Sequence, residues 1–167
     1  MSNEFNYGSN VKALAFLLNN YCNVSIEKTK ELIQEITDNK IILSNGLINS
    51  LTKQFSNATV EERKNIYDML LLAPSMHTDF SPGRVNGKNV QVLICTNPDE
   101  TLYCFSEHKG HQGIAGTPVE EYQQTLIHDH DITFYNYGGN HQECLVHVLR
   151  YLQDSIENEP DLTWNKK

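Results

Sequence analysis

Residues 75–108 read SMHTDFSPGRVNGKNVQVLICTNPDETLYCFSEH and are rich in β-branched and aromatic residues broken by turn residues. The Asn86-Gly87 pair is the strongest short signal for a hairpin, because both positions tolerate positive φ angles. Residues 97–100, NPDE, place Pro98 at the second position of another turn. The pattern therefore predicts three strands that follow one another as an antiparallel meander.

Downstream of the meander, the sequence predicts a crossover, a fourth strand and a helix. A Gly-rich connection, KGHQGIAGTP, leads into a short helix around 120–124, and TLIHD (125–129) then reads as a buried strand that ends in an acid. Residues 141–157 are expected to be helical because apolar residues recur on one side, at Cys144, Leu145, Val148, Leu149, Leu152 and Ile156.

This order of elements is that of the ribonuclease H-like fold, an α/β fold in which the fourth strand lies beside the first. Asp79 lies in the first predicted strand, and Asp129 ends the fourth. We therefore expect the two carboxylates to approach one another, with Asp129 as one half of a carboxylate pair that could bind a metal ion.

The sequence before the meander shows the periodicity of apolar residues that is typical of helices. Apolar residues recur at three- and four-residue intervals, and Ser25 and Ser44 are each placed to cap a further helix. We expect a helical N-terminal segment over 1–73, followed by a partial ribonuclease H-like core over 74–167. The two capped helices favour either a helix-turn-helix or a simple packed hairpin, and NSLTKQ in the second of them supplies a single basic residue.

The bulk composition limits the classes of partner. Lys and Arg number 13 against 21 Asp and Glu, which gives a net charge of −8, whereas a surface that binds duplex DNA is basic. We therefore expect weak DNA binding by this chain alone. No apolar run approaches the ~20 residues that span a bilayer, the start has no secretory pattern, and the four scattered cysteines indicate reduced thiols in a cytosolic protein.

Several stretches, taken together and in order, resemble the DDE transposases of the insertion sequence 66 group. They are YGSNVKALAFLL (7–18), LLAPSMHTDFSPGRVNGK (71–88), TLYCFSEHKG (101–110), LIHDHD (126–131) and HQECLVHVLRYL (141–152). The resemblance implies a bacterial cytoplasmic protein that cleaves DNA and transfers strands at transposon ends, using two Mg²⁺ or Mn²⁺ ions. Asp79 matches the family's first catalytic, metal-binding acid and Asp129 matches the second.

The sequence departs from the family in four respects. The third acid, a Glu, lies further toward the C-terminus in the family, and no glutamate in 141–159 matches it. Phe80 stands where many members carry Glu, Asp131 stands where many carry an aromatic residue, and the basic N-terminal DNA-binding region is missing. We therefore expect little transposition by this chain alone. The alternative is a catalytically inactive remnant that binds DNA ends or dimerises through its helical half.

Six further residues are accessory candidates: His77, His128, His130, Cys144, His147 and Arg150. His77 shares a strand face with Asp79, whereas His128 and His130 share a face from which Asp129 points away, so these residues cannot all bind one ion. Cys144 and His147 lie three apart on one helical face and resemble the C-x-x-H signature of several DDE transposases. Mixed Cys/His ligation is typical of zinc, but four ligands at such spacing are not visible, and HExxH and CxxC motifs are absent.

Overall fold

The computed structural model describes residues 7–158 and 161, and the chain divides into two compact units, 1–61 and 62–167. The described part of the first unit is helical, as predicted. It contains α1 (Ser9–Phe16), the π-helix η1 (Leu17–Tyr21), α2 (Ile26–Ile36) and α3 (Asn45–Ala58). These helices enclose a separate apolar core of Ala15, Ile33, Leu43, Ile48 and Leu51.

Both predicted caps of the first unit are present. The Ser25 hydroxyl accepts a hydrogen bond from the Lys28 N–H at 3.3 Å, and the Ser44 hydroxyl accepts one from the Leu47 N–H at 3.1 Å. The connection between α2 and α3, however, is eight residues long, 37–44. A helix-turn-helix joins its helices through three or four residues, so this pair has the connection of a packed hairpin instead.

The second unit begins within α4 (Val60–Leu72), earlier than the boundary expected at residue 73. The reason is packing: Leu70 is fully buried in the core of the second unit, and Ile66 and Leu71 pack against the same cluster. The helix that ends the helical segment therefore belongs to the α/β unit that follows it.

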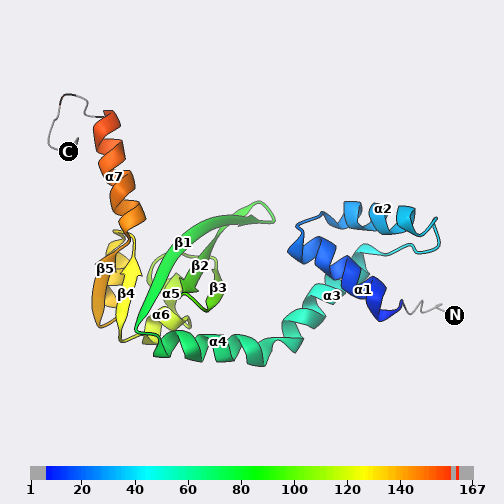
Figure 1. The fold of residues 1–167 in the computed structure, drawn as a ribbon, viewed down its shortest axis with the longest axis horizontal. Helices are drawn as coiled ribbons and strands as arrows, with labels where there is room; N and C mark the ends of the chain where they lie inside the picture. Colours follow the sequence, from blue (N-terminus) through cyan, green and yellow to red (C-terminus); the bar gives the residue numbers. More distant parts are fainter. Residues whose placement is uncertain (1–6, 159–160, 162–167) are drawn as a thin grey trace. The chain divides into compact units, whose positions relative to one another are not determined.

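In the described residues, five strands form one mixed sheet with the order β3-β2-β1-β4-β5 (Figure 1). The predicted meander is confirmed as β1 (Ser75–Val85), β2 (Lys88–Thr96) and β3 (Thr101–Ser106), paired antiparallel. β4 (Thr125–His128) runs parallel to β1 on its other side, and β5 (Asn140–Glu143) runs parallel to β4. The fourth strand thus lies beside the first, as expected.

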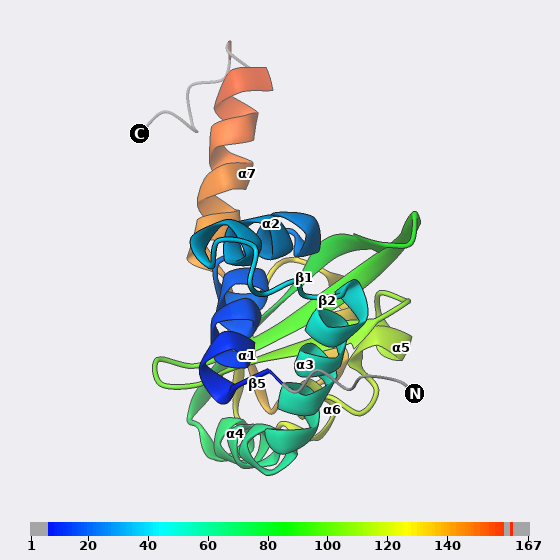
Figure 2. The ribbon, with the colours of Figure 1, turned by 90° about the vertical axis from the view of Figure 1, so that its right-hand side faces the viewer.

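Both predicted turns of the meander are present, the second closed by a hydrogen bond from the Asn97 N–H to the Glu100 carbonyl at 3.0 Å. Asn86 and Gly87 adopt positive φ angles of 51° and 77°, and the β1–β2 hairpin extends beyond the end of β3 (Figure 2). In the next turn, the Asn97 side chain accepts hydrogen bonds from the backbone N–H groups of Asp99 and Glu100.

The C-terminal part differs from prediction at one element. Residues 140–143 form β5, and α7 begins only at Leu145 and runs to Asn158, so the helix expected from residue 141 starts later. Two short helices, α5 (His111–Ile114) and α6 (Pro118–Glu121), precede β4, and the 3-10 helix η2 (Ile132–Asn136) follows it. Among the described residues, no helix is both long and apolar enough to cross a membrane.

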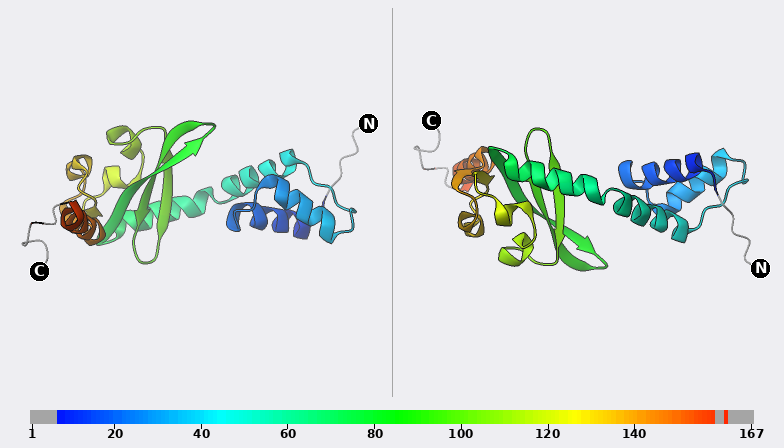
Figure 3. Two further views of the ribbon diagram at one scale, coloured as in Figure 1. Left: turned by 90° about the horizontal axis from the view of Figure 1, so that it is seen from above. Right: turned by 90° about the horizontal axis from the view of Figure 1, so that it is seen from below.

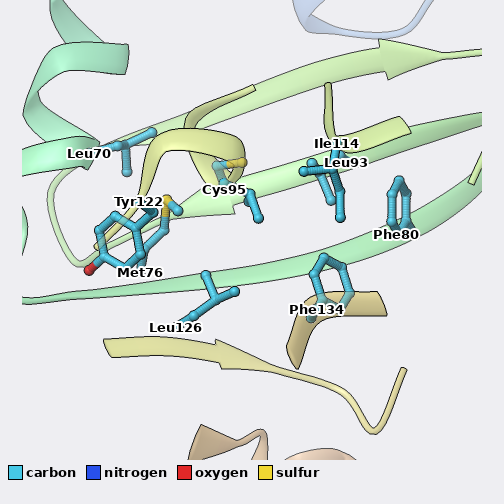
Figure 4. Close-up of a cluster of buried hydrophobic side chains, with 10 residues drawn as sticks. Leu70, Met76, Phe80, Leu93, Cys95, Ile114, Tyr122, Leu126 and Phe134 are labelled. Atoms are coloured by element: carbon cyan, nitrogen blue, oxygen red, sulfur yellow. The ribbon is translucent and has the colours of Figure 1, made fainter. Parts of the chain in front are cut away.

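One face of the sheet carries the core of the second unit (Figures 3 and 4). The short helices α5 and α6 and the 3-10 helix η2 cover this face, and Phe80 stacks on Phe134 with ring centroids 5.6 Å apart. Gly113 permits the close approach of α5, because a Cβ there would lie 2.4 Å from the His108 carbonyl oxygen and 2.9 Å from the Phe80 ring. The side chains that alternate with this core face point to the opposite side of the sheet.

Candidate functional site

A cavity of about 130 Å³ lies on the sheet face opposite the core. Its lining comes from three strands and from the start of α7: His77, Thr78, Asp79, Ile94, Thr96, Ile127, Cys144 and His147. Four of the sequence-predicted site residues, namely His77, Asp79, Cys144 and His147, are therefore brought together.

Strand alternation places Asp79 and His77 on this face. Thr78 and Phe80, between and after them, are buried toward the core, while Asp79 is half-buried. The neighbouring strand β2 contributes the residues that pair with them, since Asp79 is opposite Ile94 and His77 is opposite Thr96. The prediction that His77 and Asp79 share a face is confirmed.

The register between β1 and β4 determines where Asp129 lies. Ser75 pairs with Thr125 and His77 pairs with Ile127, so each β4 residue number exceeds that of its β1 partner by 50. Continued two residues past its last pair, His77 and Ile127, this register would place Asp129 level with Asp79, one residue past the end of β4. In a parallel pair, residues opposite one another point to the same face, and the strands lie about 4.8 Å apart.

Asp129 is half-buried and is not itself part of the cavity lining. Its carboxylate Oδ1 accepts a hydrogen bond from the Asp131 N–H at 3.1 Å, which fixes the orientation of one oxygen just beyond the strand. Asp131 serves the fold in a different way: its side chain caps η2 through the Thr133 N–H and pairs with Lys109 at 3.1 Å. The Thr133 N–H, more than Lys109, holds the pKa of Asp131 below its usual range.

The start of α7 brings His147 to Asp79. The Cys144 N–H donates to the His128 carbonyl at 2.6 Å, which attaches the beginning of the helix to the end of β4. From there His147 Nε2 reaches 3.9 Å from Asp79 Oδ2, while His147 Nδ1 is buried and has no hydrogen-bond partner among the described residues. Cys144 and His147 line the same cavity, so the prediction that they share a face is confirmed.

The first histidine of the HDHD stretch, His128, lies on the core side of the sheet. His128 is fully buried against Phe134 and Tyr135, and this burial lowers its pKa. Its Nδ1 contacts the Asp129 carbonyl and its Nε2 lies 3.2 Å from His141 Nδ1.

His130 interacts with a residue of β5 and does not line the cavity. Its Nδ1 lies 2.7 Å from Glu143 Oε1, which also accepts a hydrogen bond from the Tyr135 hydroxyl at 2.7 Å. The Tyr135 hydroxyl, followed by His130, holds the pKa of Glu143 below its usual range. The HDHD residues therefore do not converge on one point, in agreement with the sequence analysis.

Arg150 and His141 contribute nothing to the cavity lining. Arg150 is exposed on α7 and makes no ion pair with Asp154 or with any other described residue. His141 lies in the edge strand β5, not at a helix start as expected, because residues 140–143 pair with β4.

Within the described residues, no group of three or more His, Cys, Asp or Glu side chains is arranged to hold a metal ion. Among the candidate donors, the Asp79 carboxylate and the His147 imidazole lie 3.9 Å apart. This pair does not form a closed zinc site.

Sequence reasoning missed four residues of the cavity lining: Ile94, Thr96 and Ile127, and Thr78, whose side chain is buried toward the core. The alternation of side chains along β1, β2 and β4 indicates which residues share a face, but it predicts the cavity lining only when the register between the strands is known.

Comparisons of the chain with models of protein families, with curated proteins and with solved structures found no match.

Proposed function

We propose that residues 62–167 form part of a ribonuclease H-like catalytic core, derived from a DDE transposase and serving metal-dependent cleavage and transfer of DNA strands. The strand order β3-β2-β1-β4-β5 supports this proposal, because an antiparallel meander is followed by two strands parallel to the first. That is the order in which the ribonuclease H-like sheet is built.

The observation that carries the proposal is the constant offset of 50 residues between β1 and β4. Continued to residues 79 and 129, this offset would bring the two carboxylates to one level of adjacent strands and to one face of the sheet. Carboxylates on neighbouring strands, about 4.8 Å apart at the backbone, are close enough to bind a shared pair of ions.

The residues present fit Mg²⁺ or Mn²⁺. Mg²⁺ is bound in proteins by one or two carboxylates, with water and substrate phosphates completing its shell. Asp79 and Asp129 would hold the ions, which when bound would activate the attacking hydroxyl and stabilise the leaving oxygen.

Other groups of this chain contact the two carboxylates and orient them. His147 approaches the Asp79 carboxylate from α7, and the Asp131 N–H fixes one oxygen of Asp129. The apolar side chains of Ile94 and Ile127 line the same cavity as Asp79.

The proposal limits what this chain is expected to do alone. No third acid is brought to the cavity by the described residues, and the net charge of −8 opposes duplex binding. We therefore expect metal binding without strand transfer, and weak DNA binding.

The test is titration calorimetry with Mn²⁺. Asp79→Asn and Asp129→Asn each remove one charged oxygen ligand while keeping the side-chain size, so each should weaken Mn²⁺ binding by at least about tenfold. The matched control is Asp99→Asn, since Asp99 is exposed in the turn between β2 and β3 and is expected to leave the affinity unchanged.

Thermal unfolding of each variant checks that the sheet is retained. If the wild-type chain binds no Mn²⁺, or if both variants bind it as the wild type does, the metal-dependent proposal is wrong and the remnant that binds DNA ends is favoured.

A further inference from the structure

Two of the cysteines lie on adjacent strands and on the same face of the sheet. Cys95 of β2 is opposite Leu102 of β3, and Cys104 of β3 is opposite Leu93 of β2, so the two cysteines are diagonal neighbours. Leu93 and Cys95 are fully buried in the core (Figure 4), and Leu102 and Cys104 pack against the same cluster. Both thiols are free, and the Cys95 S–H donates a hydrogen bond to the Cys104 sulfur.

Cys104, unlike Cys95, reaches the surface of the molecule. It is half-buried and lines a groove of about 640 Å³, whose walls come mainly from α4 and from the edge strand β3. Tyr67 and Leu71 of α4 and Tyr103 of β3 supply apolar and aromatic surface beside the thiol. Ligand pockets in proteins measure about 300–1,000 Å³, so a small organic molecule has room to lie against Cys104.

The hydrogen bond between the two thiols gives them different acid–base behaviour. Donation by Cys95 lowers the pKa of Cys104, although the partial burial of Cys104 opposes this effect. The same hydrogen bond, followed by burial, raises the pKa of Cys95. The thiolate is the nucleophilic form of cysteine, so within this pair Cys104 is the nucleophile and Cys95 is the proton-bearing donor.

We propose that Cys104 is a site of covalent modification, whose sulfur forms a mixed disulfide with small organic disulfides that enter the groove. Cys95 is a positioning residue that donates to the Cys104 sulfur and does not itself react, since it is fully buried. The Cys104 sulfur attacks one sulfur of the reagent, the S–S bond of the reagent breaks, and a new S–S bond joins Cys104 to that half. The other half leaves as a thiolate and takes up the proton that Cys104 has released, so no further oxidant is required.

Cys22 provides an internal comparison. It is exposed, whereas Cys104 is half-buried, so accessibility alone predicts that Cys22 reacts first. The proposal predicts the opposite order at mildly acidic pH, where the supply of thiolate limits the rate. It does not depend on the metal-binding proposal, because among the described residues the groove and the cavity have no lining residue in common.

Reaction of the whole chain with dithiodipyridine, a small neutral disulfide, tests the proposal through the absorbance of the released thiopyridone. At about pH 6.5, peptide mass spectrometry should find Cys104 modified before Cys22, with a rate constant at least about threefold larger, because the thiolate reacts. Cys104→Ser should remove this fast phase, and the matched control Cys22→Ser should leave it unchanged. If Cys22 reacts first, or if Cys104 stays unmodified in the folded chain, the proposal is overturned.

Two substitutions of Cys95 separate hydrogen-bond donation from packing. Cys95→Ala removes the donor, so the pH at which Cys104 becomes reactive should rise, and its rate at about pH 6.5 should fall at least about threefold. Cys95→Ser keeps an O–H donor in a side chain of similar size and should retain most of the wild-type rate. Thermal unfolding confirms that both variants are folded. A Cys95→Ala variant with the wild-type pH profile, or a Cys95→Ser variant as slow as Cys95→Ala, overturns the role of Cys95 as the donor.

Discussion

Asp79 and His147 come from distant parts of the chain and lie 3.9 Å apart at the edge of the cavity. The contact depends on the Cys144 N–H, whose hydrogen bond to the His128 carbonyl fixes the position from which α7 starts. One imidazole nitrogen approaches the carboxylate, and the other is buried without a partner among the described residues. A buried donor or acceptor left unpaired costs about 1–3 kcal/mol, so His147 Nδ1 marks the side of the cavity where a polar group would be stabilised.

His128 should make stability depend on pH. Burial lowers the pKa of His128 in the folded chain below its unfolded value of about 6.5. As the pH falls below 6.5, the unfolded chain takes up a proton that the folded chain does not, so stability is greatest above 6.5 and is lost below it.

His128→Phe keeps an aromatic ring between Phe134 and Tyr135 but cannot titrate. Urea unfolding between pH 5 and 8 should therefore show a shallower loss of stability for this variant than for the wild type. His108→Gln, at an exposed position, is the control and should keep the wild-type slope. Equal slopes for His128→Phe and the wild type would contradict this explanation.

At the scale of elements, sequence patterns predicted those parts of the fold whose side chains carry a local signal. The caps at Ser25 and Ser44 and the Asn86-Gly87 hairpin are where residue chemistry alone indicated them. The sequence analysis did not predict β5, because its residues, NHQE, are polar and largely exposed and show no alternation of apolar and polar side chains. It is a strand only through its backbone pairing with β4, and a long-range pairing of this kind is invisible in a local pattern.

The cap of α3 offers a test at the same scale. Ser44→Ala removes the acceptor for the Leu47 N–H and should lower the stability of the first unit by about 1 kcal/mol. Ser50→Ala is the matched control: Ser50 lies within the same helix, where its hydroxyl donates to the Leu47 carbonyl, and Ala is the better helix former. Chemical unfolding followed by circular dichroism should thus rank Ser44→Ala below the wild type and Ser50→Ala at or above it; the reverse order would refute the capping role.

At the scale of the whole molecule, each of the two units has its own apolar core, and the candidate site belongs entirely to the second. The order of the elements predicted the neighbours in the sheet and pointed to Asp79 and Asp129, which the resemblance to a transposase family then matched to its first two acids. What could not be predicted was the lining around Asp79, since Ile94, Thr96 and Ile127 are brought there by the registers of two separate strand pairs.

The proximity of Asp79 and Asp129 as one metal-binding pair is most directly tested by nuclear magnetic resonance during a Mn²⁺ titration of the whole chain. Paramagnetic Mn²⁺ broadens the signals of nearby backbone amides, so the amides of residues 79 and 129 should broaden together at the same Mn²⁺ concentration. Asp79→Asn should remove the broadening at both positions. Broadening that reaches only one of the two, or that persists at residue 129 in Asp79→Asn, would contradict a shared site.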